Sequence, residues 1–113
     1  MKYLFFIIIS FILISSCSKS SDSPGQNVTC SSTKTFSADA NPVIQATCAI
    51  SPGCHAVGSI SGPGALTNYT QVFNARSAIR AAVASGTMPQ GGSLTTAQKQ
   101  AILCWIDSGA PNN

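Results

Sequence analysis

The residues best suited to chemistry in this chain are Cys48, Cys54, His55 and Met88. The first three lie in one stretch, CAISPGCHAVG, where five residues separate the cysteines and the histidine directly follows the second. Thiols and imidazoles attach cofactors, bind soft metal ions or, for thiols, form disulfides. The stretch therefore permits three interpretations: a cofactor attachment site, a small disulfide loop beside an unused histidine, or a metal or thiol site.

Metal-only and hydrolytic sites are the weaker interpretations. A structural zinc site needs about four ligands, whereas His55 is the sole histidine of the chain and the cysteines of an exported protein are expected to oxidise. A Cys-His nucleophile is disfavoured because adjacent side chains on a loop rarely face each other, and no third orienting group is evident. No carboxylate pair stands out, since Asp39 and Asp107 have the sequence context of helix-end residues.

Met88 lies in an unusual setting for a methionine, the segment SGTMPQGG. A lone methionine normally fills a gap in an apolar core, but the flanking proline and glycines cannot form a periodic apolar face. A thioether held beside Pro89 suits the sixth coordination position of a haem iron, opposite an imidazole. The four residues together therefore favour an iron-binding cofactor.

Helical signals outnumber strand signals around these residues. Asn41 and Pro42 are a suitable N-cap and first helical residue for a helix over NPVIQATC. Small-residue turns and a proline then predict a loop over residues 56–65. One helix, or two short ones, is expected between residues 67 and 86, with Gly86 just beyond its end.

The last helix has the clearest boundaries. Thr95 and Gln98 form a capping-box pattern before a segment with apolar residues at helical spacing, and Gly109 and Pro111 end that segment. Its apolar face is expected to contain Ile102, Trp105 and Ile106. The predicted fold class is all-α, with three to five helices and long loops.

This order of elements resembles that of class I cytochromes c over residues 36–113. The segments PVIQATC, CH, GTMPQGGSLTTAQKQAI and WIDSGAPNN are similar to small cytochrome c domains of the planctomycete type and of related bacterial envelope lipoproteins. The resemblance implies covalent haem c bound through Cys48 and Cys54, with His55 as the proximal iron ligand and Met88 as the distal one. The function it implies is electron transfer with other redox proteins, without an enzymatic reaction.

The resemblance also implies a class I cytochrome c-like fold in which the terminal helix, with Trp105, packs against the N-terminal helix beside the haem. One departure is the spacing of five residues between the cysteines, where the family's motif has two. Pro52 and Gly53 can fold the additional residues into a turn that keeps Cys48 within reach. Attachment through Cys54 alone, or no haem at all, remain alternatives.

The N-terminus indicates export and lipidation. Lys2 precedes an apolar run that is shorter than the ~20 residues of a membrane span and suits a signal peptide. The sequence ISSC resembles a bacterial lipobox, which implies cleavage after residue 16 and lipidation of Cys17. Residues 17–35 are then a serine-rich tether from the membrane to a domain over residues 36–113, in the cell envelope at a periplasmic or surface-facing site.

The remaining cysteines allow two balanced pairings. If haem takes Cys48 and Cys54, then Cys30 and Cys104 remain as a disulfide that fastens the tether to the last helix. A second disulfide, Cys48–Cys54, balances equally well and gives the alternative function: a haem-free, disulfide-stapled envelope lipoprotein of the same fold, acting as a binding or structural module.

The charge excludes nucleic-acid binding as a main function. After removal of residues 1–16, five basic and three acidic side chains remain, for a net charge of +2. Arg76 and Arg80 lie four residues apart on one expected helix face, and no basic stripe of the kind that neutralises phosphates is present in the sequence.

Overall fold

The computed structural model describes residues 28–113, which form helices joined by loops. A short π-helix, η1 (Phe36–Ala40), continues directly into α1 (Asn41–Thr47), and α2 (Tyr69–Ser85) and α3 (Thr96–Asp107) follow. Residues 28–113 contain no strand. The predicted all-α class is therefore confirmed. The predicted signal peptide and Cys17 lie outside the described residues.

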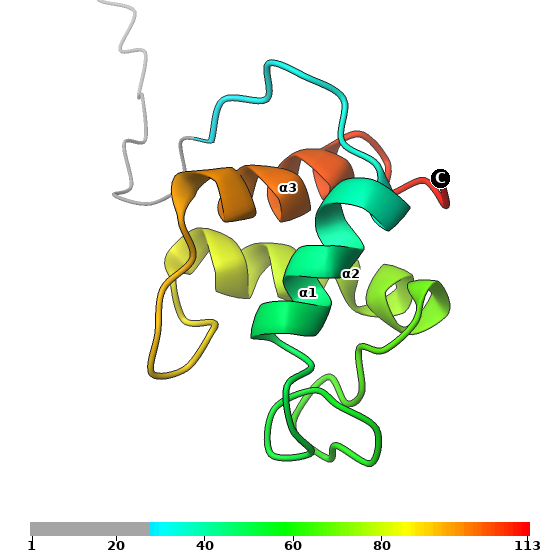
Figure 1. The fold of residues 1–113 in the computed structure, drawn as a ribbon, viewed down its shortest axis with the longest axis vertical. Coiled ribbons are helices and arrows are strands. Elements are labelled where there is room, and N and C mark those ends of the chain that lie inside the picture. Colours follow the sequence, from blue (N-terminus) through cyan, green and yellow to red (C-terminus); the bar gives the residue numbers. More distant parts are fainter. Residues whose placement is uncertain (1–27) are drawn as a thin grey trace, which may run out of the picture.

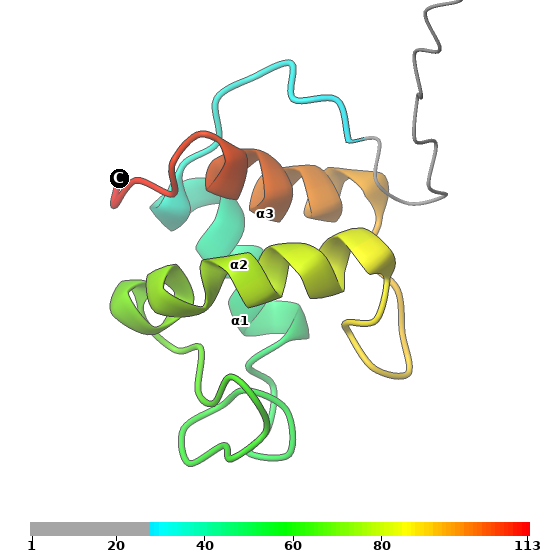
Figure 2. The ribbon, with the colours of Figure 1, turned by 180° about the vertical axis from the view of Figure 1, so that it is seen from behind.

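The helices pack as two neighbours crossed by a third. Helices α2 and α3 lie side by side and run in opposite directions, and η1 with α1 crosses them (Figure 1). The view from behind shows the same order, with α1 behind α2 (Figure 2). The loop between α1 and α2 and the loop between α2 and α3 both extend beyond the helices on the same side, away from α3.

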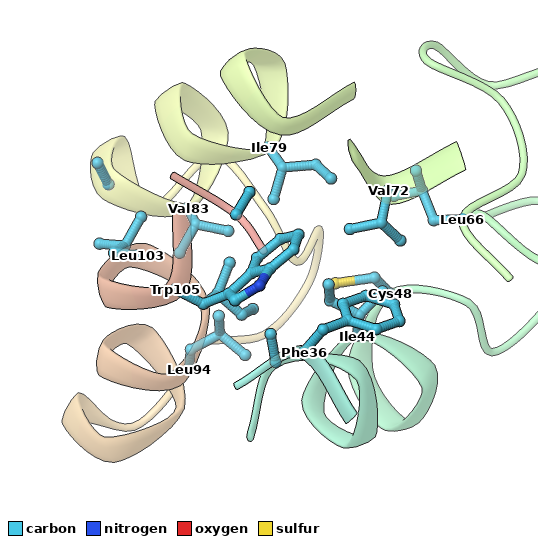
Figure 3. Close-up of a cluster of buried hydrophobic side chains, with 14 residues drawn as sticks. Phe36, Ile44, Cys48, Leu66, Val72, Ile79, Val83, Leu94, Leu103 and Trp105 are labelled. Carbon is cyan, nitrogen blue, oxygen red and sulfur yellow. The ribbon is translucent and has the colours of Figure 1, made fainter. Parts of the chain in front are cut away.

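Trp105 is the centre of the core. Its side chain is fully buried, and its indole Nε1 donates a hydrogen bond to the carbonyl of Pro111 at 2.9 Å. The Phe36 ring lies 5.2 Å from the Trp105 ring and 5.1 Å, edge on, from the Tyr69 ring. Figure 3 shows Trp105 between side chains of α2 and of η1 with α1. The predicted packing of the last helix on the first is confirmed.

The first helix begins earlier than the sequence suggested. Asn41 was expected as the N-cap, but it continues the helix, whose N-cap is Thr35: its hydroxyl accepts a hydrogen bond from the Ala38 N–H at 3.2 Å. Asp39 strengthens this start by accepting from the Thr35 N–H at 2.8 Å. Pro42 fits inside the helix because a wider π turn precedes it, whereas its ring would clash with the preceding turn of a regular α-helix.

The other helix ends agree with the sequence. Gly86 follows α2 in the left-handed conformation, with φ of 76°, as a C-cap glycine does. Thr95 caps α3: its hydroxyl accepts from the Gln98 N–H at 3.2 Å, while the Gln98 side chain accepts from the Thr95 N–H at 2.9 Å. Both predicted caps are confirmed.

The Thr95 cap is expected to contribute measurably to stability. Thr95→Ala removes the hydroxyl acceptor and leaves an N–H of the first turn of α3 without a partner, at a cost of about 1 kcal/mol in the free energy of unfolding. Urea denaturation measures this difference. Thr96→Ala is the matched control, because this neighbouring threonine is also exposed and has no capping role. Equal stability of the two variants would contradict the assignment of the cap.

The segment before η1 is fastened to α3. Cys30 and Cys104 form a disulfide with an S–S distance of 2.01 Å, which confirms the predicted pairing. Next to it, the side chain of Gln100 donates to the carbonyl of Thr29 at 3.1 Å, and Val28 packs against the core. No helix within residues 28–113 is long and apolar enough to cross a membrane.

Candidate functional site

A cavity of about 710 Å³ lies between the helices and the two long loops. This volume falls within the roughly 300–1,000 Å³ of typical small-molecule and cofactor sites. Its walls are mostly apolar, with Ile44 from α1 and with Ile79 and Val83 from α2. All four residues singled out in the sequence line this cavity, although 32 residues of the chain lie between His55 and Met88.

His55 is the only buried polar or charged side chain of residues 28–113, with 6% of its surface exposed. Its backbone is fixed on both sides: the N–H donates to the carbonyl of Cys48 at 3.0 Å, and the carbonyl accepts from the Leu66 N–H at 2.8 Å. The ring is fixed as well, because Nδ1 lies 2.8 Å from the carbonyl oxygen of Gly64. The imidazole therefore has a defined position on the cavity wall.

This hydrogen bond also shows which ring nitrogen carries a proton. A carbonyl oxygen only accepts hydrogen bonds, so Nδ1 of His55 must hold the proton and donate it to Gly64. In the neutral imidazole, Nε2 then keeps its lone pair, and it has no hydrogen-bond partner among the described residues. Metal-binding histidines commonly donate their other ring nitrogen to a carbonyl in this way. His55 is thus prepared to give one nitrogen ligand.

The additional residues between the cysteines form the predicted turn. The Cys54 N–H donates to the carbonyl of Ser51 at 3.0 Å, and Pro52 and Gly53 occupy the exposed middle of this turn. The base of the loop is closed by the hydrogen bond between His55 and the carbonyl of Cys48. The additional residues therefore form a turn that exposes Pro52 to solvent, while both cysteines stay at the cavity.

Cys48 and Cys54 are free thiols in different environments. Cys48 is only 8% exposed, belongs to the core cluster and has its sulfur 3.4 Å from the Thr47 hydroxyl. Burial raises the pKa of the Cys48 thiol, the Thr47 hydroxyl opposes this effect, and the nearby Cys54 adds to it. Cys54 is half-buried. The two sulfurs are therefore not equivalent chemically.

This difference predicts unequal alkylation in protein without cofactor. Only the thiolate reacts rapidly, and burial raises the pKa of Cys48. Iodoacetamide near neutral pH is therefore expected to modify Cys54 first, with Cys48 reacting only as the pH rises towards and above its raised pKa. Peptide mass spectrometry after timed quenching measures both rates. Reaction in 6 M urea is the control, because unfolding should make the rates similar. Faster modification of Cys48 in the folded protein would contradict the conclusion that burial makes Cys48 the less reactive thiol.

Met88 is held at the cavity by the end of α2. Its N–H donates to the carbonyl of Ala82 at 3.2 Å, just beyond the left-handed Gly86. The side chain is half-buried, and both Met88 and Pro89 line the cavity. The cavity thus has a thioether from one loop and an imidazole from the other.

Some features of the site had no clear signal in the sequence. Gly64 is the hydrogen-bond partner of His55, and its carbonyl is placed by the turn in which its N–H donates to Ser61. The α2 wall includes the small residues Ala78 and Ala82, which leave space next to Ile79 and Val83. Only the GPG sequence at residues 62–64 and the alanines of α2 could have indicated these roles.

No cluster of three or more His, Cys, Asp or Glu side chains suited to a metal ion occurs within residues 28–113. Comparisons of the chain with protein-family models, with curated proteins and with solved structures found no match.

Proposed function

We propose that this protein is a lipid-anchored monohaem c-type cytochrome that transfers electrons in the bacterial cell envelope. The observation that supports this most is that Cys48, Cys54, His55 and Met88 line one apolar cavity. The proposed fold is a small class I cytochrome c-like fold around the haem. The protein is proposed to act as an electron carrier with redox proteins of the envelope as partners, and not as an enzyme.

The donor set fits a c-type haem. The cavity has a volume suited to a cofactor and apolar walls, which match the apolar faces of a porphyrin. His55 offers its Nε2, which has no partner among the described residues, and Met88 offers a thioether. Cys48 and Cys54 are both reduced, as attachment through thioethers requires. When bound, the haem supplies a ferrous–ferric couple, and thioether ligation favours a comparatively high reduction potential.

The protein's own residues orient the proposed iron ligand and shield the ferrous–ferric couple from water. The Gly64 carbonyl holds the proton on Nδ1 of His55, so Nε2 stays available as a ligand. Ile44, Ile79 and Val83 exclude water from the cavity wall, which lowers the local polarity around bound iron. The turn at Pro52 and Gly53 keeps Cys48 at the cavity despite the longer spacing.

The proposed anchor is Cys17, at the end of the lipobox-like ISSC. Acyl chains at this residue would hold the protein on the membrane, because two or more buried chains give durable attachment. From Cys17 the chain reaches the disulfide at Cys30 after 13 residues, which span at most about 45 Å. This length allows the domain to turn towards partners beside the membrane.

The haem-free alternative uses the same cavity differently. In that case Cys48 and Cys54 form a second disulfide, and the apolar cavity binds another ligand or only completes a structural module. The structure has both residues as free thiols. In an oxidising compartment, neighbouring thiols that carry no cofactor are expected to pair, so their redox state after export separates the two functions.

The test is the colour of the exported protein. The full precursor is produced in a bacterial host that attaches haem outside the cytoplasm, and the product is purified from the membrane. We expect a red protein with the sharp reduced-state absorbance bands of a low-spin c-type cytochrome, and a haem stain that survives denaturing electrophoresis. A well-folded but colourless product would contradict the proposal.

A further inference from the structure

The loop between α1 and α2 carries exposed apolar side chains. Ile50, Val57 and Ile60 are 63%, 76% and 99% exposed, and they are the only exposed large hydrophobic residues within residues 28–113. This loop extends beyond the helices, on the side away from α3 (Figures 1 and 2). Val57 and Ile60 do not line the cavity, so the cavity does not account for their exposure. Exposed apolar side chains gathered on one protruding loop indicate a surface that contacts something apolar.

A turn within the loop fixes the position of Val57. The Ser59 N–H donates to the carbonyl of Ala56 at 3.1 Å, which closes a four-residue turn with Val57 at its first corner. Gly58 occupies the second corner with a φ of 84°, a conformation that this type of turn requires and that glycine adopts readily. The backbone therefore presents Val57 to solvent at the corner of the turn.

The hydroxyl groups next to these apolar side chains are hydrogen-bonded inside the loop. The Ser59 hydroxyl donates to the carbonyl of Cys54, and the Ser61 hydroxyl donates to the carbonyl of Gly53 at 3.1 Å. The sequence also has no Asp, Glu, Lys or Arg at residues 41–75. A hydroxyl or a charge that leaves water without a partner costs free energy. A loop whose hydroxyls are satisfied and which has no charge can therefore enter an apolar phase at little cost.

A lipid surface fits this loop better than a protein partner does. Residues 49–65 contain no Trp, Tyr or Arg, which are the residues that dominate the binding energy of protein interfaces. The 13 residues from Cys17 to Cys30 span at most about 45 Å. A domain of this size is about 30 Å across. The loop can therefore reach the membrane that holds Cys17, although the disulfide fastens the tether to α3.

We propose that Val57 and Ile60, with Ile50 of the same loop, insert into the lipid surface to which the protein is anchored and turn this side of the domain towards the membrane. The inference rests on the proposed function, because the acyl anchor at Cys17 is part of it. The acyl chains hold the protein on the membrane, and the loop sets which side of the domain faces the lipid. Because the contact is apolar, it needs no anionic lipid, unlike the attraction of a basic segment to a membrane.

Photolabelling from the lipid tests this contact. The exported, acylated protein is placed in phosphatidylcholine vesicles that contain a phospholipid with a diazirine in its acyl chain, and peptide mass spectrometry locates the adducts after illumination. We expect roughly ten times more adduct on residues 56–61 than on residues 95–97, which are exposed at the start of α3. The ratio should be the same at low salt and at about 0.5 M salt, because salt screens only charge attraction. An unlabelled loop in acylated protein would overturn the inference.

The variant Val57→Ser/Ile60→Ser separates a lipid contact from a contact between two copies. Both side chains are exposed, so their loss is not expected to disturb the core. We expect adducts on the loop to fall to the level of residues 95–97, whereas the control Ala97→Ser, at an exposed position of α3, keeps the wild-type pattern. A wild-type dimer in detergent micelles that this double variant loses would assign the loop to a second copy and overturn the proposal. A protein exported without acyl chains would instead contradict the proposed function.

Discussion

Replacement of His55 with alanine is expected to remove the low-spin spectrum of the exported protein completely. His55 is the sole histidine of the chain and the only imidazole on the cavity wall, and its Nε2 has no hydrogen-bond partner among the described residues. Without it, iron in the cavity has no imidazole ligand from this chain. We expect loss of the sharp reduced-state bands and at least a ten-fold lower yield of haem-stained protein, measured by absorbance and gel staining.

Met88→Ala is the matched control for this result. Met88 is proposed as the distal ligand, so its loss is expected to leave haem attached while changing the spectrum and lowering the midpoint potential, since thioether ligation raises that potential. The two variants thus distinguish a ligand that is needed for stable haem binding from one that changes the midpoint potential. An unchanged absorbance spectrum in His55→Ala would remove this residue from the site.

Loss of the disulfide is the largest stability change that we expect. Cys30 and Cys104 are 74 residues apart, and cross-linking a loop of this length lowers the entropy of the unfolded chain by an amount worth roughly 4 kcal/mol in the chain-entropy model. Cys30→Ala tests this with little damage to packing, because Cys30 is exposed whereas Cys104 belongs to the buried face of α3. Urea denaturation of the purified protein measures the free energy of unfolding.

Thr29→Ala is the control for the disulfide. This neighbour is also exposed, and its hydrogen bond to α3 is made by the backbone carbonyl, which accepts from the side chain of Gln100 and remains in the variant. We expect stability within about 0.5 kcal/mol of the wild type, as for most surface substitutions. A Cys30→Ala variant as stable as Thr29→Ala would show that the disulfide does not support the fold.

Local signals in the sequence predicted most of the helix ends. The capping box at Thr95 and the left-handed Gly86 depend on residues only a few positions away, so they could be identified without the fold. The start of the first helix was predicted wrongly at Asn41. The competing cap, Thr35 with Asp39, precedes a π turn, and the regular helical spacing used for the prediction does not describe such a turn.

The candidate site was predictable as a set of residues but not as a geometry. The sequence indicated, from residue types and their order, that Cys48, Cys54, His55 and Met88 bind one cofactor. The structure places all four at one cavity. The partner of His55, the Gly64 carbonyl, could not be found because any backbone carbonyl is chemically equivalent in a sequence. The pairing of Cys30 with Cys104 belonged to both arrangements considered from the sequence, with haem on the other two cysteines or with a second disulfide between them, and the structure confirms it.

Intact mass of the exported, purified protein tests the central claim most directly. Thiol addition to a vinyl group conserves all atoms, so the account predicts the acylated chain from Cys17, less two hydrogens for the Cys30–Cys104 disulfide, plus the full mass of one haem. Alkylation after unfolding then counts thioethers: no added label means both cysteines are bound, and one label means attachment through a single cysteine. A mass equal to the acylated chain alone, with or without a second disulfide, would contradict the account.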